Sequence, residues 1–531
     1  MYNFVYYWGM PSLRGSVDLE DKKMEQGPLK VAAVALLGCI LPAAATASTH
    51  TTPRFEPADC MFAVPNENSS CGYVHVPESR HSDNTQTIKL AVKIFHSRSA
   101  SPAADPIVIL QGGPGNPSLF YEAQQKSSYK VEPFLGKRDV VIVDQRGNGF
   151  SKPSLDCPQL PDASARMFTG FRTRDEIMAG TIKGAVACRE YLTAQGIRME
   201  SYNGTENAAD FDDVRKALGY KQWNLLGESN GARLALTIMR DRPQGVRSAY
   251  IGSVTSPSTF FHSGIAGAET IFKDLFQRCV SDANCNSRYP NLEDVFNQAV
   301  EKYNKKPLKL KIVDPLPNSR IAGATVEWLF TGGHIYGLLY GEMYSTELTR
   351  EAPKNIYAIF NGDTETIKKL VTRNVLMAPA YLNFGQLLTM SCLDDFAFET
   401  PTSIDSAFAF HPGAGDLEWG RLFSFARESF ELCAALVDMT QANFDFKRPV
   451  ISDIPTLIFN GDLDTATPPD DAIAAAATLK NSQLFIFKGV GHNPMLQGKC
   501  PTSMIAAFYD APMQAVDNRC MASSFGGVIF K

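Results

Sequence analysis

The segment Trp223-Asn-Leu-Leu-Gly-Glu-Ser-Asn-Gly-Ala-Arg-Leu-Ala-Leu-Thr-Ile-Met239 decides the fold of this chain. Its start predicts a short buried strand, and residues 232–239 are good helix formers. Between them, residues 227–231 match G-x-S-x-G, in which the glycines permit a sharp turn and close helix–strand packing. The motif alone usually marks a simple turn. A strand before it and a helix after it make Ser229 the candidate nucleophile, exposed at a sheet edge.

Further short apolar runs, most followed by longer amphipathic stretches, flank this segment: residues 87–95, 106–110, 139–143, 249–252, 455–459 and 483–487. Strands alternating with helices predict an α/β fold with a mainly parallel sheet and helices on both faces. Between about 257 and 450, strand-like runs are scarce and helical stretches dominate. We therefore predict a core of residues 48–256 and 451–531. Residues 257–450 are expected to form an inserted, mostly helical cap over the carboxyl edge of the sheet.

A serine nucleophile needs a base, and the chain has eight histidines. Where a turn of this kind carries the serine, the acid and then the histidine follow it along the chain, which excludes the histidines before Ser229. Three more fall in the insertion, where a surface or core role is the simpler interpretation: His262, His334 and His411. His492 directly follows a late strand-like run, in a loop that Gly489 and Gly491 make tight. We predict His492 as the general base.

The acid should end the strand that precedes the histidine strand, where Asp462 and Asp464 are available. We predict Asp464, because a turn after the strand would direct it towards His492 and its carboxylate would hold the imidazole tautomer. Asp462 is interpreted as a turn residue that binds its own backbone. Asp470 and Asp471 follow two prolines and are expected at a helix start.

A glycine-rich loop, Leu110-Gln-Gly-Gly-Pro-Gly115, ends an earlier strand-like run. Adjacent glycines can turn backbone N–H groups towards a ligand. With the N–H of the residue after the nucleophile, such a loop forms an oxyanion hole. We predict the N–H groups of Gly113 and Asn230 as its donors. The alternative is a simple Gly-Pro turn.

These segments resemble the α/β-hydrolase peptidases, which include prolyl aminopeptidases and secreted tripeptidyl aminopeptidases. Four segments carry the resemblance to the family: Gly112–Gly115, Asp144–Ser151, Gly227–Gly231 and Gly461–Pro468. Similarity to the tripeptidyl group continues elsewhere: Asn207–Asp210, Asp213–Gly219, Arg233–Leu236, Cys279–Cys285 followed by Tyr289-Pro290, and Ser391–Asp394. The resemblance implies an α/β-hydrolase fold with a cap, Ser229, Asp464 and His492 as a triad, and an acyl-enzyme mechanism. It implies no metal and no organic cofactor.

The sequence departs from the family at two positions near the site. Gln111 stands where the family often has histidine, and Asn230 where an aromatic usually follows the nucleophile. Backbone donors survive both changes, but side-chain contributions to the substrate pocket change. An aminopeptidase also needs an anion for the substrate's amino terminus. Glu228 is the best placed by sequence, and four other acids are candidates: Glu327, Glu342, Asp394 and Asp395.

Cysteines and the N-terminal region concern the compartment. Of 11 cysteines, ten lie beyond the apolar N-terminal run, and none has a metal-site spacing. An even number of cysteines is consistent with disulfides in an oxidising compartment. The resemblance implies that sequence neighbours pair: Cys60–Cys71, Cys157–Cys188, Cys279–Cys285, Cys392–Cys433 and Cys500–Cys520.

The N-terminal region predicts a cleaved leader. Lysines precede the apolar run Val31–Leu41, and Ala45-Thr-Ala47 forms an A-x-A cleavage pattern. The run is about half the roughly 20 residues that a membrane span needs. We predict a signal peptide of residues 1–47, with Met24 as an alternative start, and a secreted or periplasmic protein that is not held in a membrane. Lipoprotein anchoring at Cys39 is the rival interpretation.

Composition narrows the function classes. The chain has 531 residues, 44% hydrophobic residues and a net charge of -5, which excludes a disordered chain and gives no sign of a nucleic-acid partner. The first hypothesis is a secreted serine hydrolase that cleaves short peptides from peptide N-termini. The second is a carboxylesterase that uses the same triad on small or xenobiotic esters. The third is a binding protein on an inactive hydrolase fold. The sequence predicts no oligomeric state.

Overall fold

The computed structural model describes residues 53–61, 68–81, 86–120, 130–160, 171–313, 325–373, 382–410 and 428–531. The expected signal peptide, residues 1–47, lies outside these residues, as does His411. Within the described ranges, no helix combines the length and the apolar character that crossing a bilayer requires.

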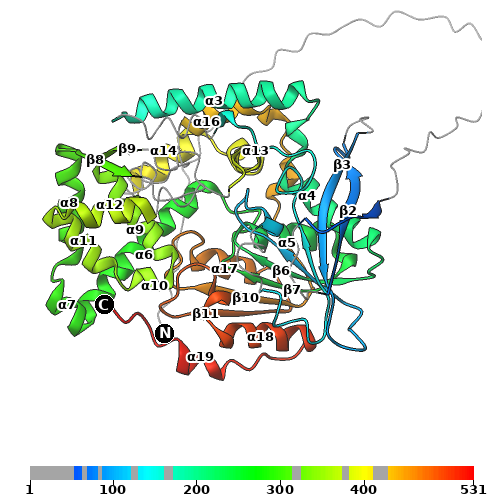
Figure 1. Cartoon of the computed structure of the whole chain (residues 1–531). Coiled ribbons are helices and arrows are strands. Elements are labelled where there is room, and N and C mark those ends of the chain that lie inside the picture. The colour runs from blue at the N-terminus through cyan, green and yellow to red at the C-terminus, as the bar shows by residue number, and fades with distance from the viewer. Residues whose placement is uncertain are drawn as a thin grey trace, which may run out of the picture. The chain divides into compact units, whose positions relative to one another are not determined.

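Nine strands form one sheet, in the order β1-β2-β3-β5-β4-β6-β7-β10-β11 (Figure 1). Their bounds are β1 Arg54–Pro57, β2 Ser69–Pro77, β3 Thr87–Phe95, β4 Ile107–Leu110, β5 Val140–Val143, β6 Trp223–Glu228, β7 Val246–Gly252, β10 Thr456–Gly461 and β11 Ser482–Phe487. Every pairing from β5 to β11 is parallel, and β1, β2, β3 and β5 pair antiparallel. The sheet is thus mainly parallel, as the sequence predicts, and the first two strands are additions that the sequence analysis missed.

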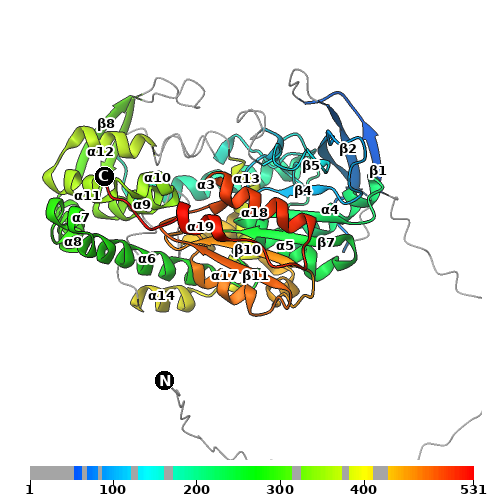
Figure 2. The same cartoon turned by 90° about the horizontal axis from the view of Figure 1, so that it is seen from below.

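Helices cover both faces of the sheet because alternate strand residues point to opposite sides. Val141 and Val143 lie in the cluster that contains residues of α4 (Gly204–Ala217), α5 (Asn230–Asp241) and α17 (Pro469–Ala476). Val140 and Ile142 lie in the cluster that contains α18 (Lys499–Asp510), against which α19 (Arg519–Ser524) packs. Figure 2 shows α17 and α18 on opposite sides of β10 and β11. Burial on both faces explains why β4, β5 and β6 are buried throughout.

Between β7 and β10 the chain is mostly helical, and we call the described residues of 257–450 the helical part. Its helices are α6 Phe261–Ser281, α7 Ala283–Arg288, α8 Leu292–Lys305, α9 Gly332–Tyr344, α10 Thr346–Thr349, α11 Ala352–Asn361, α12 Thr364–Val371, α13 Phe384–Asp394, α14 Pro401–Phe410 and α16 Glu428–Leu436. One hydrophobic cluster unites α6 to α9, α11 and α12. This part therefore has a core of its own beside the sheet.

A second helical cluster combines segments from both sides of β7. Helix α3 (Arg174–Ala194) precedes the nucleophile in sequence, yet it packs against α16, and Figure 1 shows the two helices side by side. Cys157, Cys188, Cys392 and Cys433 lie in the same cluster. The helices beside the sheet thus come from residues before β6 as well as from the helical part.

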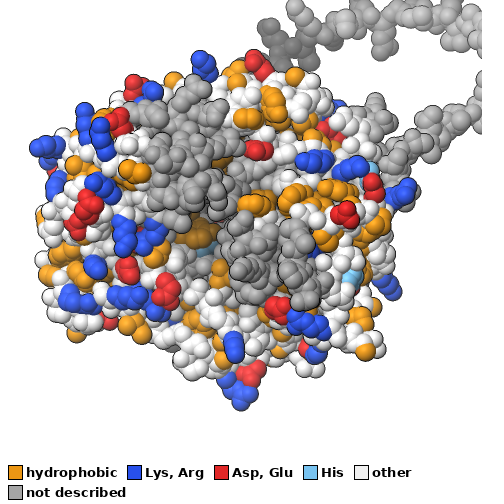
Figure 3. Space-filling model, in the orientation of Figure 1, with side chains coloured by type: hydrophobic (Ala, Val, Ile, Leu, Met, Phe, Trp, Pro, Cys, Tyr) orange, Lys and Arg blue, Asp and Glu red, His pale blue; other side chains and the backbone are white. Residues whose placement is uncertain are grey.

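All ten cysteines beyond the N-terminal run form disulfides. The pairs are those that the resemblance implies: Cys60–Cys71, Cys157–Cys188, Cys279–Cys285, Cys392–Cys433 and Cys500–Cys520. On the face in Figure 3, acidic and basic side chains of the described residues are interspersed rather than gathered by sign.

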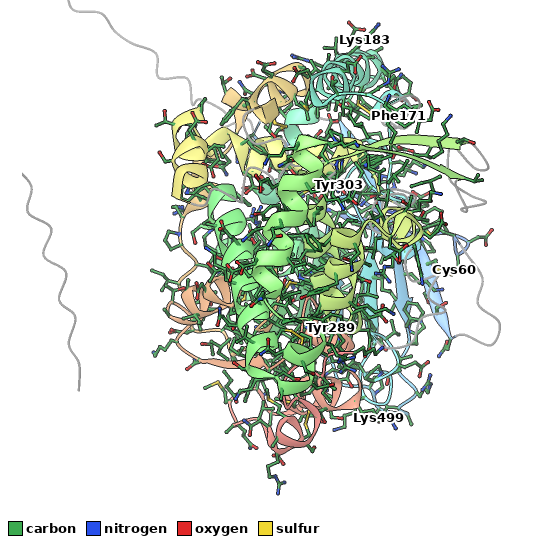
Figure 4. The ribbon with its side chains drawn as sticks, turned by 90° about the vertical axis from the view of Figure 1, so that its left-hand side faces the viewer. Cys60, Phe171, Lys183, Tyr289, Tyr303 and Lys499 are labelled. Carbon is green, nitrogen blue, oxygen red and sulfur yellow. A yellow bond between two sulfur atoms is a disulfide. The ribbon has the colours of Figure 1, made fainter. Side chains whose placement is uncertain are left out.

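The helical part also contains a hairpin that the sequence analysis missed. Strands β8 (Leu308–Val313) and β9 (Thr325–Phe330) pair antiparallel. The Nζ atom of Lys309 on β8 lies 5.0 Å from the ring centroid of Phe171, just before α3. Figure 4 shows this side, with Phe171 beside the hairpin and Tyr303 on α8. Strand β8 contains no long continuous apolar run, because only every second residue of β8 is buried or half-buried.

Candidate active site

Ser229 lies at a sharp turn between β6 and α5. Its backbone has φ 60° and ψ -128°, a conformation that a residue with a side chain rarely adopts. A Cβ at Gly231 would overlap the carbonyl oxygen of Leu110, and one at Gly227 would overlap that of Gly231. The Ser229 N–H donates to the carbonyl oxygen of Gly252 on β7 at 2.9 Å. The two glycines of the motif are thus required by close backbone approach, and the strained serine is fixed by the strands around it.

His492 and Asp464 form a buried pair. His492 Nδ1 lies 2.8 Å from Asp464 Oδ2 and 2.9 Å from Oδ1, and neither side chain is exposed. Asp464 also accepts bonds from the N–H groups of Ala466 and Thr467 at 3.0 Å, and from Thr467 Oγ1 at 2.7 Å. Burial by itself would raise the pKa of Asp464. The charge and hydrogen bond of His492, with the donors of Thr467, outweigh burial and hold that pKa below its ordinary value.

His492 Nε2 is buried and has no hydrogen-bond partner among the described residues. Ser229, Asp464 and His492 follow β6, β10 and β11, which are parallel members of one sheet. Parallel strands present their carboxyl ends at a common edge, where ligands of open α/β sheets bind. The structure therefore brings the three predicted residues to one edge, with a ring nitrogen left for a proton.

The glycine-rich loop lies against the nucleophile. A Cβ at Gly112 would be 3.0 Å from the Ser229 Cβ and 3.6 Å from the Asn230 nitrogen. Gly113 has φ +121°, which only glycine adopts readily. The Gln111 carbonyl oxygen accepts a bond from Gln145 Nε2 at 2.9 Å, so the loop is anchored to the next strand end. The loop and the first turn of α5 thus meet beside Ser229.

The acids considered for a substrate amino terminus all have protein partners. Glu228 is buried, and its Oε2 lies 3.2 Å from Lys130 Nζ. The other pairings are Glu327 with Lys311, Glu342 with Arg373 and Asn355, Asp394 with the Gly204 N–H, and Asp395 with Arg233 and Lys447. Burial raises the pKa of Asp394 to about 7. Each acid thus has a charged or polar partner, but both Glu228 carboxylate oxygens are buried without a hydrogen bond among the described residues.

Asp462 differs from its sequence interpretation, which was wrong. Its Oδ1 accepts a bond from the Gly489 N–H at 2.7 Å, and its Oδ2 accepts one from Arg278 at 2.9 Å. Asp462 therefore links the loop that carries His492, which we call the histidine loop, to α6 instead of binding its own turn. The partner is 184 residues away in sequence, so no local pattern could have identified it.

Two histidines of the helical part have structural roles. His262 Nδ1 lies 2.9 Å from Glu399, and His334 Nδ1 lies 2.8 Å from Thr331 Oγ1 at the start of α9. Burial lowers the pKa of His334 to about 3.

Sequence reasoning missed Thr467, although it lies inside the family-like segment Gly461–Pro468.

The chain belongs to the α/β-hydrolase fold family, because residues 105–499 match the family described as "alpha/beta hydrolase fold". It is 24% identical over 515 residues to "Serine protease Hip1" of Mycobacterium tuberculosis, covering 90% of this chain and 94% of that protein. It is 29% identical over 197 residues to "Tripeptidyl aminopeptidase" of Streptomyces coelicolor, covering 35% of each chain. The resemblance to α/β-hydrolase peptidases is thereby confirmed as a distant relationship.

Two further similarities complete the comparison. A "Proline iminopeptidase" of Neisseria meningitidis is 23% identical over 215 residues, covering 40% of this chain and 51% of that protein. The solved structure of a proline iminopeptidase from Mycobacterium smegmatis covers 83% of this chain and 98% of its own, with 16% identity and a TM-score of 0.37. The sequence relatives identify a hydrolase related to peptidases.

Proposed function

We propose that this protein is a serine hydrolase that cleaves short peptides from peptide N-termini through an acyl-enzyme. The observation that carries the proposal is the buried His492–Asp464 pair, 2.8 Å apart, whose Nε2 has no partner among the described residues. Asp464 and His492 follow β10 and β11, and the strained Ser229 follows β6 of the same sheet. A base that is oriented on one nitrogen and available on the other is the arrangement that activates a serine.

The proposed reaction proceeds in two halves. His492 Nε2 takes the proton of Ser229 Oγ as that oxygen attacks the scissile carbonyl, and Asp464 stabilises the imidazolium. The N–H groups of Gly113 and Asn230 stabilise the oxyanion, each worth on the order of 3 kcal/mol. His492 then gives the proton to the leaving amine. Water, deprotonated by the same base, releases the peptide acid and restores Ser229.

Peptide specificity is supported by the relatives, which include a serine protease, a tripeptidyl aminopeptidase and a proline iminopeptidase. Carboxylesterase activity is the second candidate. It is favoured by the protein partners of four acids considered for a substrate amino terminus: Glu327, Glu342, Asp394 and Asp395. An ester without a free amino group needs no such acid.

Three measurements test the proposal. A fluorophosphonate probe should label the wild type at Ser229, and Ser229→Ala should lose both labelling and turnover while its melting temperature stays unchanged. Next, kcat/KM is compared for a matched ester and amide, each with a free and an acetylated amino terminus. A preference for the free amino terminus on the amide supports the aminopeptidase. Negligible amide cleavage with indifference to acetylation supports the esterase, and full activity of Ser229→Ala contradicts both.

We also propose that the protein is secreted or periplasmic. Five disulfides support an oxidising compartment. Expression of the full chain in a secreting host and sequencing of the mature N-terminus should place the cleavage after Ala47. Cleavage directly before Cys39, with lipid attached to that cysteine, would instead establish lipoprotein anchoring.

A further inference from the structure

The loop that carries His492 is held from two sides. On the sheet side, the Asn493 N–H donates to Ser253 Oγ at 2.8 Å. On the side of the helical part, the His492 N–H donates to the Tyr344 carbonyl oxygen at 3.0 Å, and the Gly491 N–H donates to Thr346 Oγ1 at 3.1 Å. Tyr344 ends α9 and Thr346 begins α10. The corner between these helices, residues 343–346, thus supplies acceptors to two consecutive N–H groups of the histidine loop.

The corner and the loop are in direct backbone contact. A Cβ at Gly491 would overlap the carbonyl oxygen of Met343, so the glycine allows this approach. Met343 and Thr346 are buried, and Met343 belongs to the hydrophobic cluster of the helical part. Removing the Thr346 hydroxyl would leave the buried N–H of Gly491 without its acceptor, which is unfavourable because the N–H has lost its hydrogen bonds to water. The hydrophobic packing of the helical part around Met343 therefore fixes the position of the corner.

The Tyr344 ring also contacts the base itself. Its centroid lies 4.2 Å from that of the His492 imidazole, with 36° between the ring planes. Tyr344 is 42% exposed, whereas His492 is 3% exposed. The phenol ring thus covers the imidazole while part of its own surface faces solvent. It restricts ring rotation, and its π face attracts the positive charge that forms when His492 takes a proton.

The loop that carries Asp464 also contacts α9. Thr465 Oγ1, next to Asp464, donates to the Tyr340 carbonyl oxygen on α9 at 3.2 Å. The last turn of α9 and the start of α10 therefore touch both loops of the His–Asp pair. The Ser229 turn, by contrast, contacts the backbone of β4 and of the loop after it, the end of β7 and its own helix.

Resting on the proposed serine hydrolase function, we propose that the α9–α10 corner positions the general base, with Tyr344 and Thr346 as positioning residues. The helical part would then support proton transfer by His492 in addition to shaping the substrate site. Misplacing a reacting group by about 1 Å can lower a rate by about 100-fold. Loss of the corner contacts should therefore reduce chemistry at Ser229 even for substrates too small to use a cap.

The test uses the full mature protein and four variants. Thr346→Val removes the acceptor and keeps the shape, and Thr346→Ser keeps the hydroxyl. Tyr344→Leu removes the ring. Thr349→Val is the matched control, because Thr349 is a buried threonine of α10 whose hydroxyl donates to the Ser345 carbonyl oxygen. The readouts are kcat and KM for p-nitrophenyl acetate, the rate constant of fluorophosphonate labelling, and the melting temperature.

We expect Thr346→Val and Tyr344→Leu to lower kcat and the labelling rate constant by about tenfold or more, with KM changed less than twofold. Thr346→Ser should recover most of the loss. Thr349→Val should have about the same melting temperature as Thr346→Val and Tyr344→Leu. Its labelling rate constant should equal that of the wild type. Unchanged labelling in folded Thr346→Val and Tyr344→Leu, or a rise in KM alone, overturns the positioning role. Absence of labelling in the wild type instead overturns the proposed function itself, so the two failures are distinguishable.

Discussion

The turn at Ser229 and the loop at His492 are supported by different parts of the molecule. Close contacts with the backbone of the sheet fix the serine turn, where Gly227 and Gly231 leave no room for a side chain. The histidine loop rests on the sheet through Ser253 and on the helical part through Tyr344 and Thr346. The nucleophile is thus set by local chain geometry, whereas the base depends on packing between distant segments. Four predictions test this difference.

The largest effect is expected at the serine turn. Gly231→Ala would place a methyl group on the Leu110 carbonyl oxygen, so the turn must move or the protein must unfold. We expect loss of fluorophosphonate labelling and a lower melting temperature. Gly136→Ala is the control, because nothing lies within 4 Å of a Cβ there. Wild-type labelling by folded Gly231→Ala would contradict the close approach of α5 to β4.

The two aspartates after β10 should differ strongly in kcat. Asp464→Asn removes the carboxylate that holds the His492 tautomer, and a loss of about 10⁴-fold in kcat is expected. Asp462→Asn should cost much less, because Asp462 contacts the Gly489 N–H and Arg278 instead of the imidazole. Steady-state kinetics on one ester decide the matter. Equal losses in the two variants would overturn the choice of Asp464.

Two buried aspartates should respond to pH with opposite sign. The pKa of Asp464 is lowered, so its stabilising contribution is present above the ordinary value of 3.8 and is lost as pH falls through the lower, folded value. Burial raises the pKa of Asp394 from 3.8 to about 7, so folding loses stability as pH rises from about 4 to 7. Asp394→Asn should therefore gain melting temperature relative to wild type at pH 8 and little at pH 4. A gain that is equal at both pH values would contradict this assignment.

The smallest effect on chemistry is expected at the disulfide between α13 and α16. The double variant Cys392→Ser/Cys433→Ser opens a link across 41 residues and should lose about 2–4 kcal/mol of stability. This disulfide lies in the cluster of α3, α13 and α16, whereas the α9–α10 corner contacts the histidine loop. The double variant should therefore change KM for long peptides more than it changes the fluorophosphonate labelling rate. Equal losses on long peptides and small esters would contradict that order.

Sequence alone predicted the parts that depend on neighbouring residues. The run from Trp223 to Met239 contains the strand, the turn and the helix, so Ser229 could be identified from its flanks. Fully buried strands such as β5 were visible as continuous apolar runs. The half-buried hairpin β8–β9 escaped the same search, because its alternating pattern gives a weaker signal.

Only the tertiary structure decided which distant groups meet. Glu228 adjoins the nucleophile in sequence, yet its carboxylate is buried against Lys130, whose position no local pattern fixes. Tyr344 and Thr346 carry no sequence signal, but they hold the histidine loop almost 150 residues further on. Local conformation follows from backbone sterics and the spacing of apolar residues, which are properties of one segment. Hydrogen bonds and ion pairs between segments depend on how the sheet and the helices pack, and the sequence specifies them only through the complete fold.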